Sequence, residues 1–273
     1  MNLSEEKKRC LKSLMKEYAE KDVCVAFSGG VDSSLVLVLA CEAARETKKK
    51  VYALTMDTVL HPKADLETAR QVLEKTSAYH FILHSDELAV PEIRNNPVNR
   101  CYLCKKELYL RMLSFAREKG TDVLLEGSNE DDMHVYRPGR RAIEELKVHS
   151  PLARCHFTKE EVRAFAAEYG ISVASRPSAP CLATRLPYGT EIDLSLLERI
   201  EKAEEFLKTI ITGNIRVRLH GDILRLEADP EAMGRICEKR EDIIEELKKV
   251  GVPYITLDLE GFRSGSMDIG LSQ

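Results

Sequence analysis

Residues 23–34 read Val-Cys-Val-Ala-Phe-Ser-Gly-Gly-Val-Asp-Ser-Ser, an apolar run that passes directly into a glycine turn and then into a polar helix start. The β-branched run Val23–Phe27 predicts a buried strand. Gly29 and Gly30 allow a sharp turn that brings backbone N–H groups close to an anion. A helix expected over Ser34–Thr47 would add the positive partial charge of its N-terminus. The stretch therefore predicts a phosphate-binding loop.

Strand and helix patterns alternate through the first two thirds of the chain. This alternation predicts an α/β fold with a doubly wound parallel sheet, and it places ligands at the carboxyl ends of the strands. An opening amphipathic helix carries Leu11, Leu14, Met15 and Tyr18 on one stripe. The expected strands are Val23–Phe27, Val51–Met56, His80–His84 and Val123–Glu126, and the expected helices are Ser34–Thr47, Ala64–Ser77, Arg100–Lys119 and one that runs from the capping box Thr158–Glu161 to Gly170.

A loop with three prolines and a glycine, residues 175–189, marks the junction with a smaller second domain. We expect domains at 1–174 and 175–273, the second of them α+β. Its expected elements are a helix at Leu194–Ile211, a hairpin of Ile215–Leu219 and Ile223–Glu227 that turns at Gly221-Asp222, a helix at Pro230–Val250 and a strand at Tyr254–Leu257.

Composition restricts the class of protein. The chain has 273 residues, a net charge of −4 and scattered Lys and Arg, a balance that disfavours a nucleic-acid partner. Its apolar stretches are too short to span a membrane. The charged start of the chain, Glu5 to Arg9, does not resemble a signal peptide. We therefore expect a cytoplasmic protein.

The chain contains eight cysteines, which a cytoplasmic protein keeps reduced, so we expect no disulfides. Cys10, Cys24, Cys41 and Cys237 fall among apolar neighbours in predicted helices or a strand, a pattern typical of core packing. Cys155, beside His156, is also interpreted as structural.

Two other cysteines have the spacing of a metal site. Cys101 and Cys104 lie three positions apart on a predicted helix, so their sulfurs face the same way. Cys181 follows Pro180 in the proline-rich loop and is a third candidate. Three thiolates with an open position suit an iron–sulfur cluster, whereas zinc would need a fourth ligand, for which His134 and His156 are candidates. A C-x-x-C pair also occurs by coincidence.

The loop SGGVDSS has no Gly-Lys-Ser/Thr and is not a Walker loop. It resembles the PP-loop of ATP pyrophosphatases, which adenylate an oxygen with ATP and then replace AMP by a nucleophile. A larger ordered set of motifs resembles the LarE family and spans nearly the whole chain: SGGVDSS (28–34), NRCYLCK (99–105), GSNEDD (127–132), RPSAPCLATR (176–185), RVRLHGD (216–222) and FRSGSMD (262–268).

The resemblance to LarE implies an ATP-dependent sulfur transferase. Proteins of this family convert the carboxylates of pyridinium-3,5-biscarboxylic acid mononucleotide to thiocarboxylates, in the synthesis of the nickel-pincer nucleotide cofactor of lactate racemase. In one branch the cysteine equivalent to Cys181 gives up its own sulfur and becomes dehydroalanine. In the other, three cysteines hold a 4Fe-4S cluster that delivers sulfide. The presence of Cys101 and Cys104 beside Cys181 resembles the cluster branch.

Within this resemblance, the loop would hold the phosphates of ATP while Asp32 binds Mg²⁺. Lys105 would contact phosphate or developing charge, although a solvated helix lysine explains it equally well. Met56, at the end of a strand, would contact adenine or else belong to the core. Asp131 and Asp132 would add Mg²⁺ or ribose contacts or form a surface turn. The expected nucleotide-binding residues are Ser28, Gly29, Gly30, Asp32, Ser33, Ser34, Met56, Gly127 and Asn129, and the expected catalytic residues are Cys181, Asp32 and Lys105.

The second substrate carries a phosphate and two carboxylates and therefore needs cations. Arg216 and Arg218 lie two apart on a predicted strand, so they share a face and could clamp a phosphate. An exposed polar face with paired carboxylates is the simpler alternative. Thr184 and Arg185, close after Cys181, would orient the carboxylate that is activated.

Other functions share parts of this pattern. A transfer-RNA thiolase can combine a PP-loop with a three-cysteine cluster, but the acidic balance disfavours it. An amidotransferase-type synthetase would share SGGVDSS without needing Cys101, Cys104 and Cys181. A nucleotide-binding redox sensor would bind ATP and a cluster without releasing pyrophosphate. We expect a small-molecule nucleotide substrate and a homo-oligomer.

Overall fold

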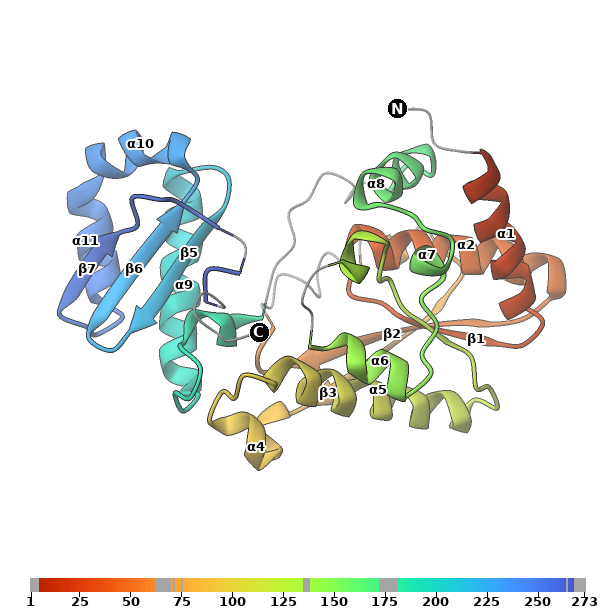
Figure 1. Cartoon of the computed structure of the whole chain (residues 1–273). Helices are drawn as coiled ribbons and strands as arrows, with labels where there is room; N and C mark the ends of the chain where they lie inside the picture. Colours follow the sequence, from red (N-terminus) through yellow and green to blue (C-terminus); the bar gives the residue numbers. More distant parts are fainter. Residues whose placement is uncertain are drawn as a thin grey trace. The chain divides into compact units, whose positions relative to one another are not determined.

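The computed structural model describes residues 5–61, 70, 72–74, 76–134, 138–171, 181–263 and 265–267. The chain divides into two compact units; in Figure 1 most of the first is coloured from red to green, and the second is coloured from teal to blue apart from the yellow α4 (Pro91–Arg94) segment. The first comprises residues 1–89 and 99–179, and the second comprises 90–98 and 180–273. The second unit thus includes a short segment from the first half of the chain. The domain junction expected at 174–175 lies outside the described residues.

The first unit is built on a four-stranded parallel sheet of order β3-β2-β1-β4. This confirms the α/β fold expected from the alternating pattern. The pairing of β1 with β2 starts at Val23 opposite Val51, and that of β2 with β3 starts at Tyr52 opposite Tyr79. The strands are β1 (Val23–Ala26), β2 (Val51–Thr58), β3 (Tyr79–Ser85) and the very short β4 (Leu124–Leu125).

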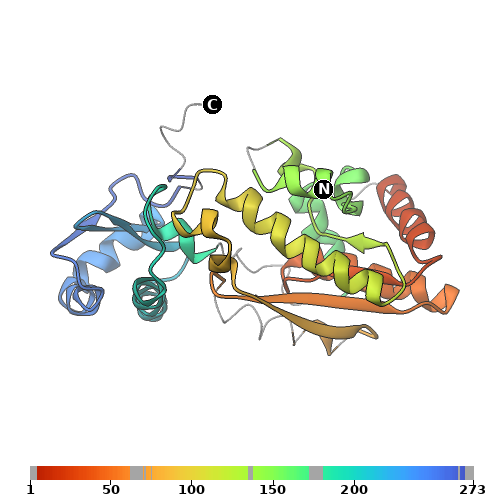
Figure 2. The ribbon, with the colours of Figure 1, turned by 90° about the horizontal axis from the view of Figure 1, so that it is seen from below.

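Helices cover both faces of this sheet (Figures 1 and 2). Alternate residues of β1 supply the two cores: Val23 and Val25 pack into one, and Cys24 packs into the other. Cys24 and Cys41 are both buried, which confirms their packing role. The first core includes α1 (Glu5–Tyr18), α2 (Val31–Thr47), α7 (Pro151–Arg154) and α8 (Lys159–Glu168), and the second includes α5 (Arg100–Glu118) and α6 (Arg140–Glu145).

Several local predictions can be compared with these elements. Thr158 caps α8 in the predicted capping box with Glu161. The opening helix buries Leu11, Leu14, Met15 and Tyr18, as expected. Most of the helix expected over 64–77 lies outside the described residues. No helix within the described ranges is long and apolar enough to cross a membrane.

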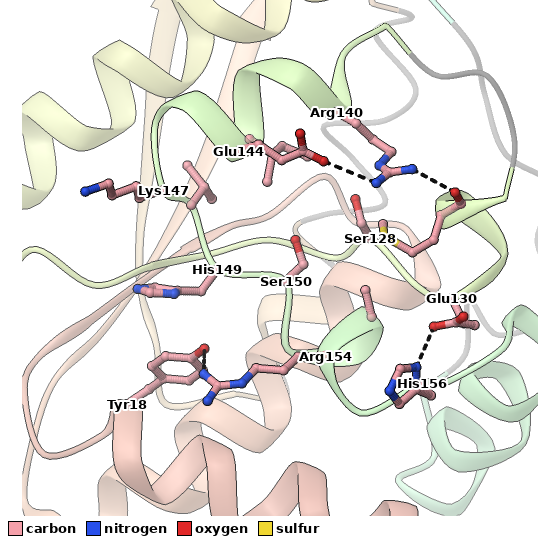
Figure 3. Close-up of a pocket in the computed structure, with 14 residues that line it drawn as sticks. Tyr18, Ser128, Glu130, Arg140, Glu144, Lys147, His149, Ser150, Arg154 and His156 are labelled. Atoms are coloured by element: carbon pink, nitrogen blue, oxygen red, sulfur yellow. Dashed lines mark hydrogen bonds and ion pairs between the residues drawn. The ribbon is translucent and has the colours of Figure 1, made fainter.

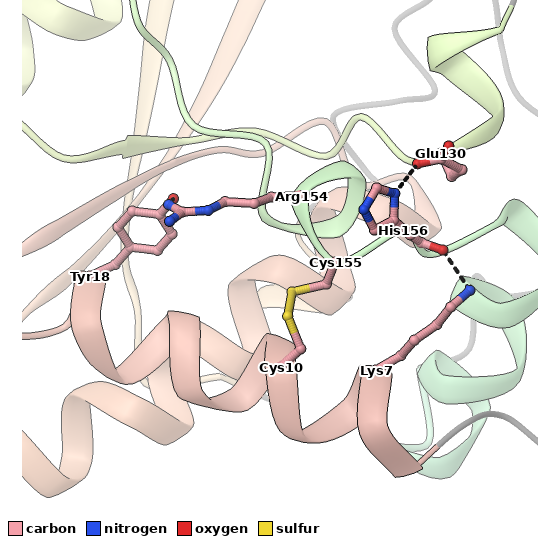
Figure 4. The surroundings of a disulfide bond; sticks show 7 residues. All are labelled: Lys7, Cys10, Tyr18, Glu130, Arg154, Cys155 and His156. Carbon is pink, nitrogen blue, oxygen red and sulfur yellow. Dashed lines mark hydrogen bonds and ion pairs between the residues drawn. A yellow bond between two sulfur atoms is a disulfide. The ribbon is translucent and has the colours of Figure 1, made fainter.

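The expectation that every cysteine is a free thiol is wrong. Cys10 on α1 and Cys155 after α7 form a disulfide (Figure 4). The packing of the two helices brings their Cα atoms to 6.1 Å, within the range that a disulfide spans. Because the two cysteines lie 145 positions apart, no local pattern indicates this pairing.

The second unit is a small α+β structure on a three-stranded sheet of order β5-β6-β7. The predicted hairpin is confirmed, and Gly221 turns with a φ of 59°. Figure 2 shows α9 and α11 beside each other on one face of the sheet. The elements are α4 (Pro91–Arg94), a 3₁₀ turn η4 (Leu182–Arg185), α9 (Leu194–Ile210), β5 (Ile215–His220), β6 (Ile223–Ala228), α10 (Met233–Glu238), α11 (Arg240–Lys248) and β7 (Tyr254–Leu257).

Two predictions for this unit are wrong. The single helix expected over 230–250 is a 3₁₀ turn, Pro230–Ala232, followed by α10 and α11. Lys239, at φ −99° and ψ 19°, leaves helical geometry and separates the two helices. Cys237 is exposed rather than packed. Its neighbour Ile236 faces the core from α10, so that the next side chain points to solvent.

Candidate active site

The loop between β1 and α2 has the geometry of an anion-binding turn. Gly29 adopts a φ of 76°, a conformation that glycine tolerates and side chains rarely do. Gly30 is the N-cap of α2. The hydroxyls of Ser28 and Ser33 lie 3.2 Å apart, and Ser33 Oγ also donates to the Gly30 carbonyl at 3.1 Å. These bonds hold the turn in shape at the N-terminus of a 17-residue helix.

Gly127 allows the segment after β4 to approach this loop. A Cβ atom at Gly127 would lie 2.8 Å from the backbone nitrogen of Ser33 and 3.1 Å from Cβ of Asp32. A contact below 3.0 Å forces one of the two groups to move, and moving the backbone at the start of a helix is costly. Gly127 was expected as a nucleotide contact, and the structure shows that its lack of a side chain also accommodates the loop itself.

Asp32 is held by two neighbours in the first unit. Its Oδ1 accepts a hydrogen bond from Asn129 Nδ2 at 3.0 Å, and its Oδ2 forms an ion pair with Lys159 Nζ. The structure therefore brings together Asp32 and Asn129, two predicted site residues. Lys159 was missed by the sequence analysis. Its only signal was its place directly after the N-cap Thr158, which says nothing about the loop.

Asp131 and Asp132 shape the turn that carries Asn129. Asp132 Oδ2 accepts from the Asn129 backbone N–H at 3.2 Å, and Asp131 Oδ2 accepts from the Lys159 backbone N–H at 2.8 Å. Both carboxylates thus bind backbone groups, but only Asp131 is exposed as in a surface turn, whereas Asp132 is buried.

Three further predicted site residues, Ser34, Met56 and Lys105, differ in their burial and contacts. Ser34 is fully buried, and its Oγ has no hydrogen-bond partner among the described residues. Met56 is partly buried against the core on the α5 face. The Lys105 side chain runs past Gly139, where an added Cβ would lie 2.5 Å from Lys105 Cδ.

Cys101 and Cys104 lie on the first turn of α5, in the first unit, and neither forms a disulfide. Cys104 is buried, and its Sγ lies 3.9 Å from Oε1 of Glu87. Glu87 is fully buried, and burial raises the pKa of its carboxyl. Cys181 belongs to the second unit, where it is the N-cap of η4.

No set of three or more His, Cys, Asp or Glu side chains in the described part of the chain is arranged to hold a metal ion. The two histidines considered as zinc ligands both bind Glu130, His134 at 2.8 Å and His156 at 2.9 Å. These hydrogen bonds lower the pKa of Glu130. Neither histidine belongs to a group of three metal-ligating side chains among the described residues.

Around Cys181, the second unit holds a connected polar cluster. Arg185 donates to both carboxylate oxygens of Glu204, from Nε at 2.9 Å and from Nη2 at 2.7 Å. Its Nη1 reaches the Cys181 carbonyl at 3.2 Å and Thr184 Oγ1 at 3.0 Å. Glu204 also accepts from the backbone N–H of Val217 at 2.9 Å. The pair fixes the backbone of the cysteine to α9 and β5.

Arg216 and Arg218 share a face of β5, as predicted, but their surroundings differ. Arg218 is 5% exposed, donates to Glu227 Oε1 at 2.9 Å and donates to the Thr184 carbonyl at 2.7 Å. Arg216 is half-buried and lies over the ring of Phe262 at 5.2 Å. Burial, together with the neighbouring charge of Arg185, lowers the pKa of Arg216. Only Arg216 thus keeps the character of an anion-binding group.

A pocket of about 660 Å³ in the first unit lies apart from the loop residues 28–34, none of which lines it (Figure 3). Among its lining residues, Arg140 pairs with Glu144 at 3.2 Å, and Arg154 donates to the neutral Tyr18 hydroxyl at 3.4 Å. With no loop residue in its lining, the pocket is distinct from the nucleotide loop.

Comparison with known proteins identifies the family of this chain. A PP-loop domain family, ATP_bind_3, matches residues 3–135. Pyridinium-3,5-bisthiocarboxylic acid mononucleotide synthase of Lactiplantibacillus plantarum is 32% identical over 267 residues, which cover 98% of this chain and 95% of that protein. This chain belongs to the LarE family. It is accordingly an enzyme of the PP-loop sulfurtransferase type and uses ATP.

Other relatives of this LarE protein differ in how much of it they match. An uncharacterized protein of Synechocystis is 33% identical over 94% of the chain and 96% of the relative. The tRNA-specific 2-thiouridylase of Rickettsia bellii is 24% identical over only 59% of the chain and 53% of the relative. Similarity to the tRNA-modifying enzymes is therefore distant and partial.

Proposed function

We propose that this protein uses ATP to convert the carboxylates of pyridinium-3,5-biscarboxylic acid mononucleotide to thiocarboxylates. The observation that carries the proposal is the similarity to the Lactiplantibacillus plantarum synthase over 95% of that protein's length. A tRNA substrate is disfavoured because the tRNA thiouridylases match only part of the chain and the net charge is −4. A cytoplasmic location and a homo-oligomer belong to the same proposal.

The first unit would bind ATP. Backbone N–H groups of residues 28–33 would hold the phosphates, helped by the hydroxyls of Ser28 and Ser33 and by the N-terminus of α2. Asp32 would hold Mg²⁺, a hard cation that prefers carboxylate oxygen. We place Met56 at the adenine. The remaining nucleotide contacts in the proposal are Gly29, Gly30, Ser34, Lys105, Gly127 and Asn129.

Activation of the carboxylate explains the need for ATP. A carboxylate is a poor electrophile because oxide is a poor leaving group. Attack of its oxygen on the α-phosphorus forms a C–O–P mixed anhydride and releases pyrophosphate. The protein contributes geometry and charge neutralisation to this step. A sulfur nucleophile then replaces AMP at the carbonyl carbon, and the thiocarboxylate remains.

The second unit would bind the pyridinium nucleotide. Arg216 is the candidate for its phosphate, because its guanidinium is half-buried and lies beside an aromatic ring. Arg218 would support this site without binding the phosphate itself, because its own charge is compensated by Glu227. Thr184 and Arg185, which bind the Cys181 backbone, would orient the reacting carboxylate beside the cysteine.

For the sulfur source we propose a 4Fe-4S cluster held by Cys101, Cys104 and Cys181. Thiolates are the ligands that such clusters take, none of the three cysteines is in a disulfide, and the first two lie one helical turn apart. When bound, the cluster would deliver a sulfide that comes from a source outside the protein. The alternative is that Cys181 donates its own sulfur, and its fixed backbone in the second unit suits that role as well.

The test is turnover by the anaerobically reconstituted protein with ATP, Mg²⁺, sulfide and the pyridinium nucleotide. The proposal predicts equal amounts of pyrophosphate and AMP together with a thiolated product. Unmodified transfer RNA in place of the nucleotide should give none of these. Thiolation of tRNA without thiolation of the nucleotide would reject the proposal.

A further inference from the structure

The ammonium group of Lys159 lies directly against the nucleotide loop. Its Nζ pairs with Oδ2 of Asp32 across 127 positions of the chain, while Oδ1 of the same carboxylate is bound by Asn129. The Lys159 side chain is 36% exposed and that of Asp32 is 19% exposed. A partly exposed cation thus borders the loop that would receive the phosphates.

The backbone at Lys159 is rigidly placed. Thr158 Oγ1 accepts from the Glu161 N–H at 3.3 Å, and Glu161 Oε2 accepts from the Thr158 N–H at 2.9 Å, so that both ends of the capping box are closed. The N–H of Lys159 itself donates to Asp131 Oδ2 at 2.8 Å. Three fixed backbone groups therefore aim this side chain at Asp32, and only its flexible stem can move.

The lysine does not benefit the helix that carries it. Lys159 is the first residue of α8, where the helix has its positive partial charge and a cation is unfavourable. Its partner Asp32 compensates for that cost from another element. The ion pair with the Asp32 carboxylate of the loop explains why a lysine suits this position, whereas the stability of α8 does not.

We propose that Lys159, in addition to Lys105, is a phosphate-contacting lysine of this ATP site. The loop SGGVDSS contains no lysine, unlike a Walker loop, so the cation must come from elsewhere. With Mg²⁺ bound, Asp32 would no longer be a partner for the ammonium of Lys159, and the phosphate oxygens of ATP would attract it instead. Lys159 therefore moves from Asp32 to the pyrophosphate oxygens when Mg-ATP binds. There it stabilises the charge that grows as the bond between the α-phosphorus and the bridging oxygen breaks.

This inference rests on the proposed function and adds a residue to it. The test compares Lys159→Met and Lys159→Ala with wild type by calorimetric titration, using Mg²⁺ with an α,β-methylene ATP analogue, whose α–β bond this enzyme cannot cleave, and, separately, AMP. Loss of one charged hydrogen bond predicts about 10- to 150-fold weaker analogue binding. AMP affinity should not change, because AMP lacks the β- and γ-phosphates. Lys159→Arg should retain most of the analogue affinity.

Lys7→Ala is the matched control. Lys7 Nζ binds the His156 carbonyl at 2.6 Å (Figure 4) and Glu161 at 2.7 Å, so it contacts the same end of α8 as Lys159. Its removal should leave both affinities unchanged. Unchanged analogue binding in both Lys159→Met and Lys159→Ala, or equal losses for AMP and the analogue, would overturn the inference. Failure of wild type to thiolate the pyridinium nucleotide would reject the proposed function but leave this binding test standing.

Discussion

Asn129 Nδ2 and Asp32 Oδ1 are joined by a hydrogen bond of 3.0 Å, although the residues lie 97 positions apart. The bond links the end of β4 to the start of α2, across the loop that would hold the phosphates. With the amide of Asn129 on one oxygen and Lys159 on the other, the carboxylate is oriented before any ligand binds. Such pre-orientation is what a metal-binding carboxylate needs.

Asp32→Ala should abolish pyrophosphate release and leave the fold intact. The variant loses the proposed Mg²⁺ ligand, but the ion pair that it breaks is partly exposed and contributes about 0–1 kcal/mol. Pyrophosphate release and thermal unfolding measured on the same preparation check both parts. A folded variant with wild-type release would show that Asp32 does not hold the metal.

Gly127→Ala should destabilise the first unit and weaken ATP binding. The new Cβ would lie 2.8 Å from the Ser33 backbone, and relieving such overpacking costs about 1–3 kcal/mol. Gly234→Ala on α10 is the control, because an added Cβ there meets no atom within 4 Å. That change should be neutral or stabilising. Equal melting temperatures and ATP affinities for Gly127→Ala and wild type would show that the contact can relax freely.

Arg216→Ala and Arg218→Ala should separate binding from stability. Arg216→Ala should weaken binding of the pyridinium nucleotide by about 10- to 150-fold, with little loss of protein stability. Arg218→Ala leaves the fully buried Glu227 without one cation, a change that costs up to about 3–5 kcal/mol, partly offset by Arg225. Neither should alter ATP affinity.

Titration of the nucleotide and thermal unfolding distinguish the two arginine variants. Arg235→Ala, on the surface of α10, is a control for removal of a positive charge. Unchanged nucleotide affinity in Arg216→Ala would remove this residue from the site.

Reduction should lower the melting temperature of wild type but not that of Cys10→Ser/Cys155→Ser. The disulfide closes a long loop, and such links typically contribute about 2–4 kcal/mol. Alkylation should distinguish the remaining thiols: exposed Cys237 should react first, and Cys24 should react last, because burial raises its pKa to about 12. Identical melting with and without reductant would contradict the stabilising link.

Much of the fold follows from local pattern. The strand, glycine turn and helix of residues 23–47 are adjacent in the chain, so their hydrophobic period and glycines predict them directly. The hairpin at Gly221 and the capping box at Thr158 are equally local. Their signals need no knowledge of distant residues, and the structure confirms them.

The site is harder to predict because its pairs are distant in the chain. The contact of Lys159 with Asp32, the fork between Arg185 and Glu204 and the disulfide of Cys10 each depend on how helices pack. The sequence analysis could predict that Arg216 and Arg218 share a face. It could not foresee that Glu227 would neutralise only one of them.

The most direct test of the account is the fate of Cys181 after turnover. Anaerobically reconstituted protein is given ATP, Mg²⁺, sulfide and the pyridinium nucleotide, and the product is quantified beside the intact mass of the chain. The account predicts several thiocarboxylates per chain, Cys181 unchanged in mass, and loss of iron in Cys101→Ala, Cys104→Ala and Cys181→Ala. One sulfur per chain with dehydroalanine at position 181, or full iron content in Cys101→Ala, would contradict it.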